Sequence, residues 1–255
     1  MPRRLILAAC ALALTPMLVG CGDDAGANPG TTPSGSATMM PAKGTVSDAS
    51  PKVSGPAGKY SVSLADIGNA WLTDIARTFV ISAESYCKQQ CLFADQAEGE
   101  KYLEQWGYVE GYETGYIPEG RDDTVLKGGY YIKVETHLFK TAEGAKSAYD
   151  YFTTYAAKSG AAPVPIQPVG NGASAFATLA GTVGETNVKA LYHQIIFVRG
   201  NVLTVILTKG AQGFMTAESA WDLAEIADAK MLGTRAAPEP TPTSNYKTPT
   251  PEPKN

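Results

Sequence analysis

Residues 191–207 read LYHQIIFVRGNVLTVIL, two nearly continuous apolar runs joined by Gly200 and Asn201. Short runs rich in isoleucine, leucine and valine are typical of buried strands. A two-residue connection that begins with glycine favours a tight turn. The segment therefore predicts a β-hairpin of residues 191–199 and 201–208, and a sheet built around it.

A second pair of strands is predicted upstream. In residues 130–139 apolar side chains alternate with Lys133, Glu135 and His137. A period of two is the pattern of a half-buried strand. We expect this strand to pair with residues 107–117.

Each strand pair is followed by a predicted helix. The two helix starts, residues 139–145 and 214–220, share the pattern F-x-T-A-E-x-A. A threonine cap and an early glutamate favour any helix start, so the match also arises without an internal repeat. Apolar residues then recur on one helix face: Ala145, Ala148, Tyr149, Phe152 and Ala156 in the first helix, and Ala220, Leu223, Ala224, Ala227 and Met231 in the second.

Two such β-β-α units predict an α+β fold, in which helices pack on one face of an antiparallel sheet. A further, broken helical segment is expected over residues 83–106. The folded domain should span residues 59–235. Residues 21–58 are rich in Gly, Ala, Ser, Thr and Pro and predict a disordered linker. The Pro/Thr-rich residues 236–255 predict a disordered tail, which serves as a spacer, binds a partner or is glycosylated.

The start of the chain resembles the signal of bacterial lipoproteins. Arg3 and Arg4 precede an apolar segment that ends in Leu18-Val19-Gly20-Cys21. The resemblance implies cleavage after Gly20, a diacylglyceryl group on the Cys21 thiol and acylation of the new amino terminus. The protein would then be lipid-anchored outside the cytoplasm, on the cell membrane or the outer membrane. The alternative is an uncleaved membrane helix.

The charge balance excludes one class of partner. The chain has 21 basic and 25 acidic residues, a net charge of −4. Loss of the signal would leave 19 basic residues and a net charge of −6. Because no basic cluster occurs after Arg4, we expect no binding to nucleic acid.

Cys87 and Cys91 are the cysteines that would remain in the exported domain. An extracytoplasmic location favours a disulfide between them, although their spacing on a regular helix is too wide for one. Two free thiols are the next alternative. Residues 78–82 followed by C-x-x-x-C also resemble the thioredoxin-like copper chaperones of the cell envelope. That resemblance implies copper binding and requires a third ligand such as His137 or His193.

Three tyrosines recur at intervals of four residues, Tyr108, Tyr112 and Tyr116, each preceded by glycine. On a regular strand this spacing places all three on one face. They are candidates for an aromatic platform that binds a flat ligand; the alternative is that they pack in the core.

The two histidines have no obvious catalytic partner. His137 shares a polar strand face with Lys133 and Glu135, which predicts solvent exposure, whereas His193 lies within an apolar strand. The sequence contains no phosphate-binding loop, H-E-x-x-H motif or nucleophile elbow. We therefore expect no enzyme activity, no cofactor and no metal.

The overall plan resembles the small sensor-like or PsbP-like lipoprotein domains of bacteria. The resemblance implies a non-enzymatic domain that binds a ligand or a partner protein of the cell envelope. Two alternatives stay open: a cysteine-dependent metal or thiol-redox protein, and a hydrolase of envelope polymers that uses His137 or His193.

Overall fold

The folded part of the chain is built on one antiparallel sheet of seven strands. The computed structural model describes residues 49–89, 93, 95–119, 129–182 and 187–236. The strand order is β1-β2-β3-β7-β6-β5-β4. The strands are β1 Trp71–Ile81, β2 Tyr108–Pro118, β3 Gly129–Phe139, β4 Ala162–Val164, β5 Gly172–Thr182, β6 Lys189–Arg199 and β7 Val202–Ala211.

Six helical segments accompany the sheet in the described part of the chain. They are the short 3-10 helix η1 Ala57–Tyr60 and the α-helices α1 Leu64–Ile67, α2 Ala83–Gln89, α3 Gln96–Trp106, α4 Ala142–Lys158 and α5 Ala217–Met231. Among the residues that the structure describes, no helix is long and apolar enough to cross a membrane.

The predicted α+β class and both β-β-α units are confirmed. β2 pairs with β3 and α4 follows; β6 pairs with β7 and α5 follows. The two helix starts are capped as expected: the Thr141 hydroxyl accepts a hydrogen bond from the Gly144 backbone N–H, and Thr216 forms a capping box with Ser219. The broken helix over residues 83–106 corresponds to α2 and α3.

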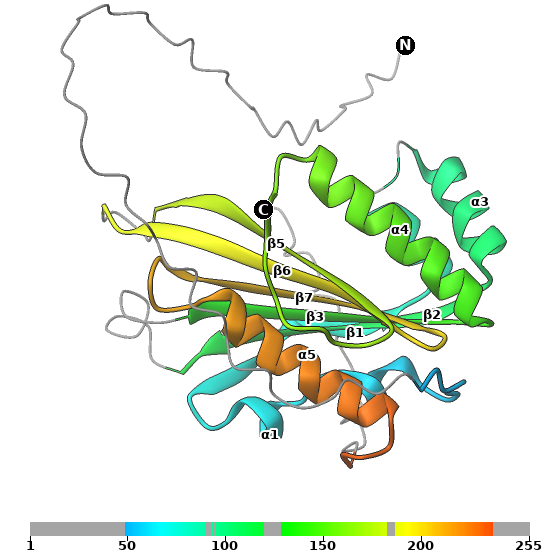
Figure 1. Cartoon of the computed structure of the whole chain (residues 1–255), viewed down its shortest axis with the longest axis horizontal. Coiled ribbons are helices and arrows are strands. Elements are labelled where there is room, and N and C mark those ends of the chain that lie inside the picture. The colour runs from blue at the N-terminus through cyan, green and yellow to red at the C-terminus, as the bar shows by residue number, and fades with distance from the viewer. Residues whose placement is uncertain (1–48, 90–92, 94, 120–128, 183–186, 237–255) are drawn as a thin grey trace, which may run out of the picture. The chain divides into compact units, whose positions relative to one another are not determined.

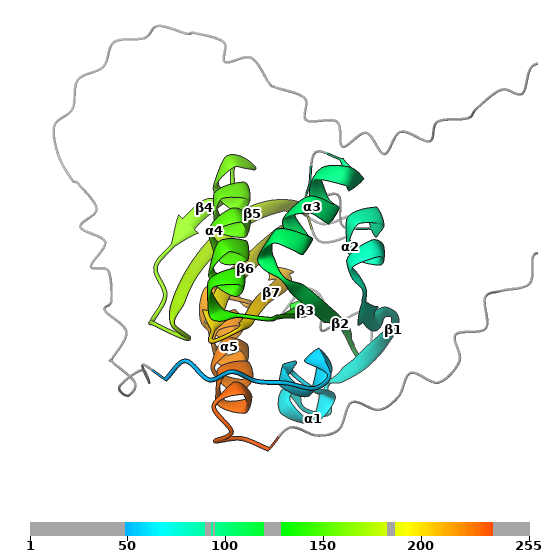
Figure 2. The ribbon, with the colours of Figure 1, turned by 90° about the vertical axis from the view of Figure 1, so that its right-hand side faces the viewer.

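The helices cover both faces of the sheet, so the expectation that they pack on one face was wrong. α4 lies on one face beside α2 and α3, and α5 lies on the other face (Figures 1 and 2). The reason lies in β6 and β7, whose nearly continuous apolar runs present large side chains to both sides. A strand that is apolar on both faces requires a cover on both.

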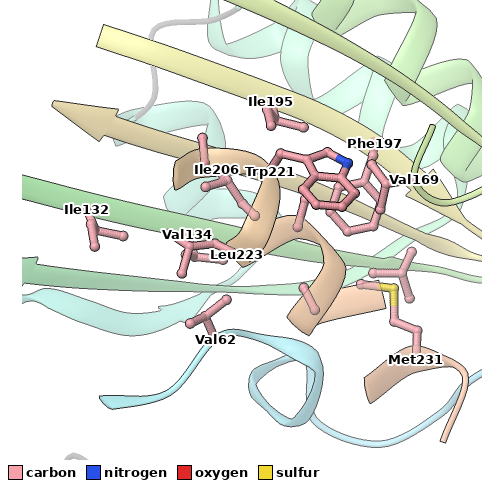
Figure 3. Close-up of a cluster of buried hydrophobic side chains, with 14 of the residues drawn as sticks. Val62, Ile132, Val134, Val169, Ile195, Phe197, Ile206, Trp221, Leu223 and Met231 are labelled. Carbon is pink, nitrogen blue, oxygen red and sulfur yellow. The ribbon is translucent and has the colours of Figure 1, made fainter. Parts of the chain in front are cut away.

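Two hydrophobic cores result. Under α5, Trp221, Leu223 and Met231 pack on a sheet surface that includes Ile195 and Ile206 (Figure 3). Under α4, Ala145, Ala148 and Phe152 pack on Ile196 and Leu203.

Residues 49–58 lie against the domain, although their composition placed them in the linker. The Asn201 side chain accepts a hydrogen bond from the Val53 N–H (2.8 Å) and donates one to the Val53 carbonyl oxygen (3.1 Å). Val53 also packs on the core under α5. We call residues 49–56 the strap. The lipoprotein signal with Cys21, the rest of the linker and residues 237–255 lie outside the described residues.

Candidate functional site

The three tyrosines do not form one platform. A register shift in β2 between Tyr108 and Glu110 reverses the alternation of side chains. Tyr112 and Tyr116 therefore point to the α5 face, whereas Tyr108 packs in the core under α4. The expectation of a shared face was wrong because the spacing holds only on a regular strand.

Tyr112 and Tyr116 are closed off from solvent. The Tyr116 hydroxyl donates a 2.6 Å hydrogen bond to the Val62 carbonyl oxygen, and burial raises the pKa of Tyr116 to about 12. An added Cβ on Gly58 would lie 3.2 Å from the Tyr112 ring, so η1 covers this tyrosine closely. Both rings serve packing, the alternative that the sequence left open.

Cys87 lies on α2 with its side chain against α3. The Cys87 sulfur lies close to Gly99 of α3, since a Cβ added to this glycine would be only 2.9 Å from the sulfur. Burial raises the pKa of the Cys87 thiol. Cys91 lies outside the described residues, so the Cys87–Cys91 disulfide stays a prediction. Among the described residues, no group of three or more His, Cys, Asp and Glu side chains is placed to hold a metal ion.

The two histidines lie on opposite faces of the sheet. His193 follows the parity of Ile195 and Phe197, which face α5, and burial lowers its pKa. His137 faces α4 and is buried, with 1% of its surface exposed, so the prediction of solvent exposure was wrong. Helix α4 covers this part of β3, and the rings of Tyr86, Tyr108 and Phe152 contact the imidazole.

A chain of polar side chains runs along β3 on the α4 face. The Lys133 ammonium bonds one oxygen of Glu135 at 2.5 Å, and the other oxygen lies 3.3 Å from His137 Nε2. His137 Nδ1 lies 3.4 Å from the Tyr108 hydroxyl, which donates to the Ile81 carbonyl oxygen at 3.1 Å. The sequence pattern identified the shared face of the three β3 residues but gave no indication that a helix covers it.

Lys133 and Glu135 are both held in their charged forms. Burial alone would raise the pKa of the Glu135 carboxyl, but the Lys133 ammonium and the His137 hydrogen bond outweigh it and lower the pKa to about 2. For Lys133 burial acts to lower the pKa, and the neighbouring carboxylates of Glu135 and Glu113 reverse this and raise it. The result is a fixed ion pair.

Further acid and base flank this pair. Glu113 on β2 is directly opposite Glu135 on β3 and is fully buried. Like charges placed opposite one another on a sheet repel. The Arg77 guanidinium, 3.6 Å from Glu113, and the Lys133 ammonium offset this repulsion. Within the described part of the chain, this cluster thus has two basic side chains, Arg77 and Lys133, and two acidic ones, Glu113 and Glu135.

A cavity of about 180 Å³ lies beneath the carboxyl-terminal half of α4, and the ion pair forms part of its lining. The sheet contributes side chains from four neighbouring strands, β3, β7, β6 and β5. The polar lining residues are Lys133, Glu135, Thr178, Gln194, Tyr155 and Ser159, and the apolar ones are Phe152, Ala156, Ala161, Ile196 and Val205. One group of residues therefore offers hydrogen bonds and the other an apolar surface, as in ligand-binding pockets.

A larger hollow of about 540 Å³ runs along the strap. Two of its polar lining residues already bind backbone: Asn201 bonds Val53, and Glu110 accepts a hydrogen bond from the Ala57 N–H at 2.7 Å. These groups hold the strap and the start of η1 in place. The cavity beneath α4 is therefore the stronger candidate for a ligand site.

No protein-family model matches this sequence, and no curated protein matches it. Among solved structures, the chain is similar to the extracellular domain of PknH from Mycobacterium tuberculosis. The match has 16% sequence identity and a TM-score of 0.33, and it covers 67% of this chain and 92% of that one. A similarity at this level assigns neither a family nor a function.

Proposed function

We propose that this protein is a lipid-anchored lipoprotein of the cell envelope whose domain binds a small ligand in the cavity beneath α4 without catalysing a reaction. The observation that carries the proposal is the cavity itself. It combines a fixed ion pair, further hydrogen-bonding side chains and an apolar wall under one helix.

The ionisation of the cavity supports binding over catalysis. A general base works best when its pKa is near the working pH, and the pKa of Glu135 is about 2. A lysine nucleophile needs a lowered pKa, whereas that of Lys133 is raised. Both side chains are therefore suited to hold a ligand and poorly suited to transfer protons or form covalent bonds.

The surroundings of His137 support the same conclusion. Its neighbour Tyr108 has a hydroxyl that donates to a backbone carbonyl, and burial raises the pKa of this tyrosine. Deprotonating this hydroxyl to make it a nucleophile would break its hydrogen bond and create a buried negative charge, and both changes are unfavourable. The imidazole is enclosed by aromatic rings, so the hydrolase alternative has no accessible base here.

Ligand binding is tested with the mature protein in detergent micelles and a mixed panel of small sugars, amino acids, carboxylates and amines. A ligand that binds only the folded state raises the unfolding midpoint. We expect at least one class of compound to raise the unfolding midpoint of the original protein. The same compounds should not raise the midpoint of Thr178→Trp, because the larger side chain occupies the cavity that Thr178 lines. Leu179→Trp is the matched control, because Leu179 is the next residue on β5 and is 59% exposed. A panel that stabilises neither the original protein nor Leu179→Trp would contradict the proposal.

The lipid anchor is tested separately. Cys21→Ser should leave the domain folded and abolish the incorporation of labelled fatty acid, since Cys21 would carry the lipid. Cys87→Ser is the control and should keep the label. Continued labelling of Cys21→Ser would overturn the assignment of the anchor.

A further inference from the structure

We infer that the cavity beneath α4 takes an uncharged ligand with neighbouring hydroxyl groups, of the size of a single sugar ring. This inference rests on the proposed function and names the class of ligand. It follows from the charge balance of the cavity, the hydrogen bonds that its floor can offer, and its size and apolar wall.

The charge balance favours a neutral ligand. Lys133 is paired with Glu135, whose side chain is 4% exposed, and Arg77 lies beside the fully buried Glu113. A carboxylate ligand would place a third negative charge near Glu113 and Glu135, and an amine would place a further positive charge against Lys133. Burying a charge without a partner is costly. A ligand without net charge avoids this cost.

The ion pair has hydrogen-bonding capacity beyond its own contact. An ammonium carries three N–H donors, and among the described residues Glu135 is the partner that the Lys133 ammonium bonds. A carboxylate accepts up to about four hydrogen bonds, and Glu135 makes contacts to Lys133 and His137. Donor and acceptor thus lie side by side at the floor.

Two adjacent hydroxyls match this arrangement, because each hydroxyl can both donate and accept. One can accept from the Lys133 ammonium while its neighbour donates to the Glu135 carboxylate. Hydrogen bonds to charged groups are stronger than those between neutral groups. Gln194 and Thr178 line the same cavity and can bond further hydroxyls of the ring.

The apolar part of the lining suits the C–H face of a sugar. Phe152 and Ala156 on α4 and Ile196 and Val205 on the sheet form the apolar part of the lining, and Tyr155, which also lines the cavity, is 42% exposed. The aromatic rings of Phe152 and Tyr155 provide a large apolar surface, against which the C–H groups on one face of a pyranose can pack. The volume of about 180 Å³ equals that of roughly six water molecules. It is smaller than the cavities of about 300–1,000 Å³ that hold drug-sized ligands, so one ring fits and a chain of sugars does not.

The experiment is an NMR titration of the mature protein in micelles with methyl pyranosides of glucose, galactose and mannose. We expect saturable shifts of the backbone amides of Lys133, Gln194 and Ala156 with at least one of them. For the pyranoside that binds best, removing either of two adjacent hydroxyls should weaken binding at least about tenfold. Butyrate and butylamine at the same concentration should shift these amides little.

Variants separate the ion pair from the shape of the cavity. Lys133→Met should weaken pyranoside binding at least about tenfold, and Thr178→Trp, which leaves the ion pair intact, should abolish it. The control Lys146→Met removes an exposed lysine of α4 that pairs with Asp150 and should bind as the original protein does. If Lys133→Met does not fold, Thr178→Trp and the deoxy sugars still decide the question.

The outcomes distinguish the two proposals. If butyrate or butylamine changes the chemical shifts of the cavity amides and no pyranoside does, the inference of a ligand with neighbouring hydroxyl groups is overturned. The proposed function would still stand. The inference is also overturned if a pyranoside changes the chemical shifts of amides outside α4 and β6 instead, or if its chemical-shift changes persist in Thr178→Trp. If no probe shifts these amides and the mixed panel gives no stabilisation, both proposals fail.

Discussion

The Arg199 guanidinium binds the Asp228 carboxylate through two hydrogen bonds, from Nε to Oδ1 at 2.6 Å and from Nη2 to Oδ2 at 2.7 Å. Arg199 ends β6 and is fully buried, and Asp228 lies in the last turns of α5. Arg199 Nη1 also donates to the Ala49 carbonyl oxygen at 2.7 Å. One side chain thus joins the central hairpin, the helix on one face of the sheet and the start of the strap.

Asp228→Asn should strongly destabilise the fold. The change keeps the shape of the side chain but leaves the buried Arg199 charge without its anion. Breaking a buried ion pair on one side costs about 3–5 kcal/mol in the free energy of unfolding. Urea denaturation measures this loss.

The matched control is Asp150→Asn, which breaks the Lys146–Asp150 pair, with both side chains 58% exposed. An exposed pair contributes about 0.5 kcal/mol or less. Equal losses for the two variants would show that burial adds nothing to the Arg199–Asp228 interaction.

Gly200→Ala should displace the strap. Gly200 has a φ of +54°, and an added Cβ would lie 1.8 Å from the Pro51 carbonyl oxygen, so the two backbones cannot keep their present distance. We expect the loss of the Val53–Asn201 hydrogen bonds and a roughly tenfold faster exchange of the Val53 amide. Hydrogen exchange of the native protein measures it.

Gly233→Ala is the control for this prediction. Its φ is +70°, but nothing lies within 4 Å of an added Cβ. Gly233→Ala should lower the free energy of unfolding only by the strain of alanine in a left-handed backbone conformation, about 1–2 kcal/mol. It should leave the Val53 amide protected from exchange. Unchanged exchange in Gly200→Ala would mean that the strap adjusts without releasing Val53.

The sequence predicted the class of the fold well because the pattern was local. The apolar runs around Gly200 and the caps at Thr141 and Thr216 each specify an element from a few neighbouring residues. The same apolar runs also indicate helices on both faces of the sheet, because a strand that is apolar on both sides requires a cover on both.

The site was harder to predict because it depends on contacts between distant segments. The bulge after Tyr108 changes the face of that tyrosine, and no local pattern marks it. The alternation along β3 makes Lys133, Glu135 and His137 look solvent-exposed, but the helices packed on that face bury Glu135 and His137 and leave the Lys133 side chain 21% exposed. When both partners of an ion pair lie on one strand, the local sequence pattern does not show whether the pair is buried or exposed.

A thiol titration tests the predicted Cys87–Cys91 disulfide. The mature protein, unfolded in denaturant without reductant, should show no reactive thiol, and after reduction it should show two. Denaturant is needed because burial raises the pKa of Cys87 and slows its reaction in the folded state. Cys87→Ser should show one reactive thiol without reductant.

Two reactive thiols in the unreduced protein would contradict the disulfide. The copper alternative is tested on the same sample after reduction: we expect no copper retained on a desalting column. Copper retained by the original protein and lost in Cys87→Ser would favour the metal-binding alternative instead.

The Glu135 carboxylate should make stability depend on acidic pH. Its pKa is lowered from 4.5 to about 2 in the folded state, so the unfolded chain binds a proton at higher pH than the folded one. The stabilisation is therefore complete above pH 4.5 and is lost as the pH falls from 4.5 towards 2. Glu135→Gln should be a few kcal/mol less stable than the original protein at neutral pH, because Lys133 loses its anion. This difference should shrink steadily across that window.

Urea denaturation of both proteins at intervals between pH 7 and pH 2 measures the difference directly. Comparing the two proteins cancels the other acids that titrate there, including Asp66, whose pKa is lowered by Lys230 and Ser63 against the effect of burial. The control Glu104→Gln removes an exposed carboxylate of α3, and its stability should follow that of the original protein at every pH. A Glu135→Gln difference that stays constant between pH 4.5 and pH 2 would show that Glu135 is not held ionised by Lys133, and would remove the fixed ion pair from the cavity.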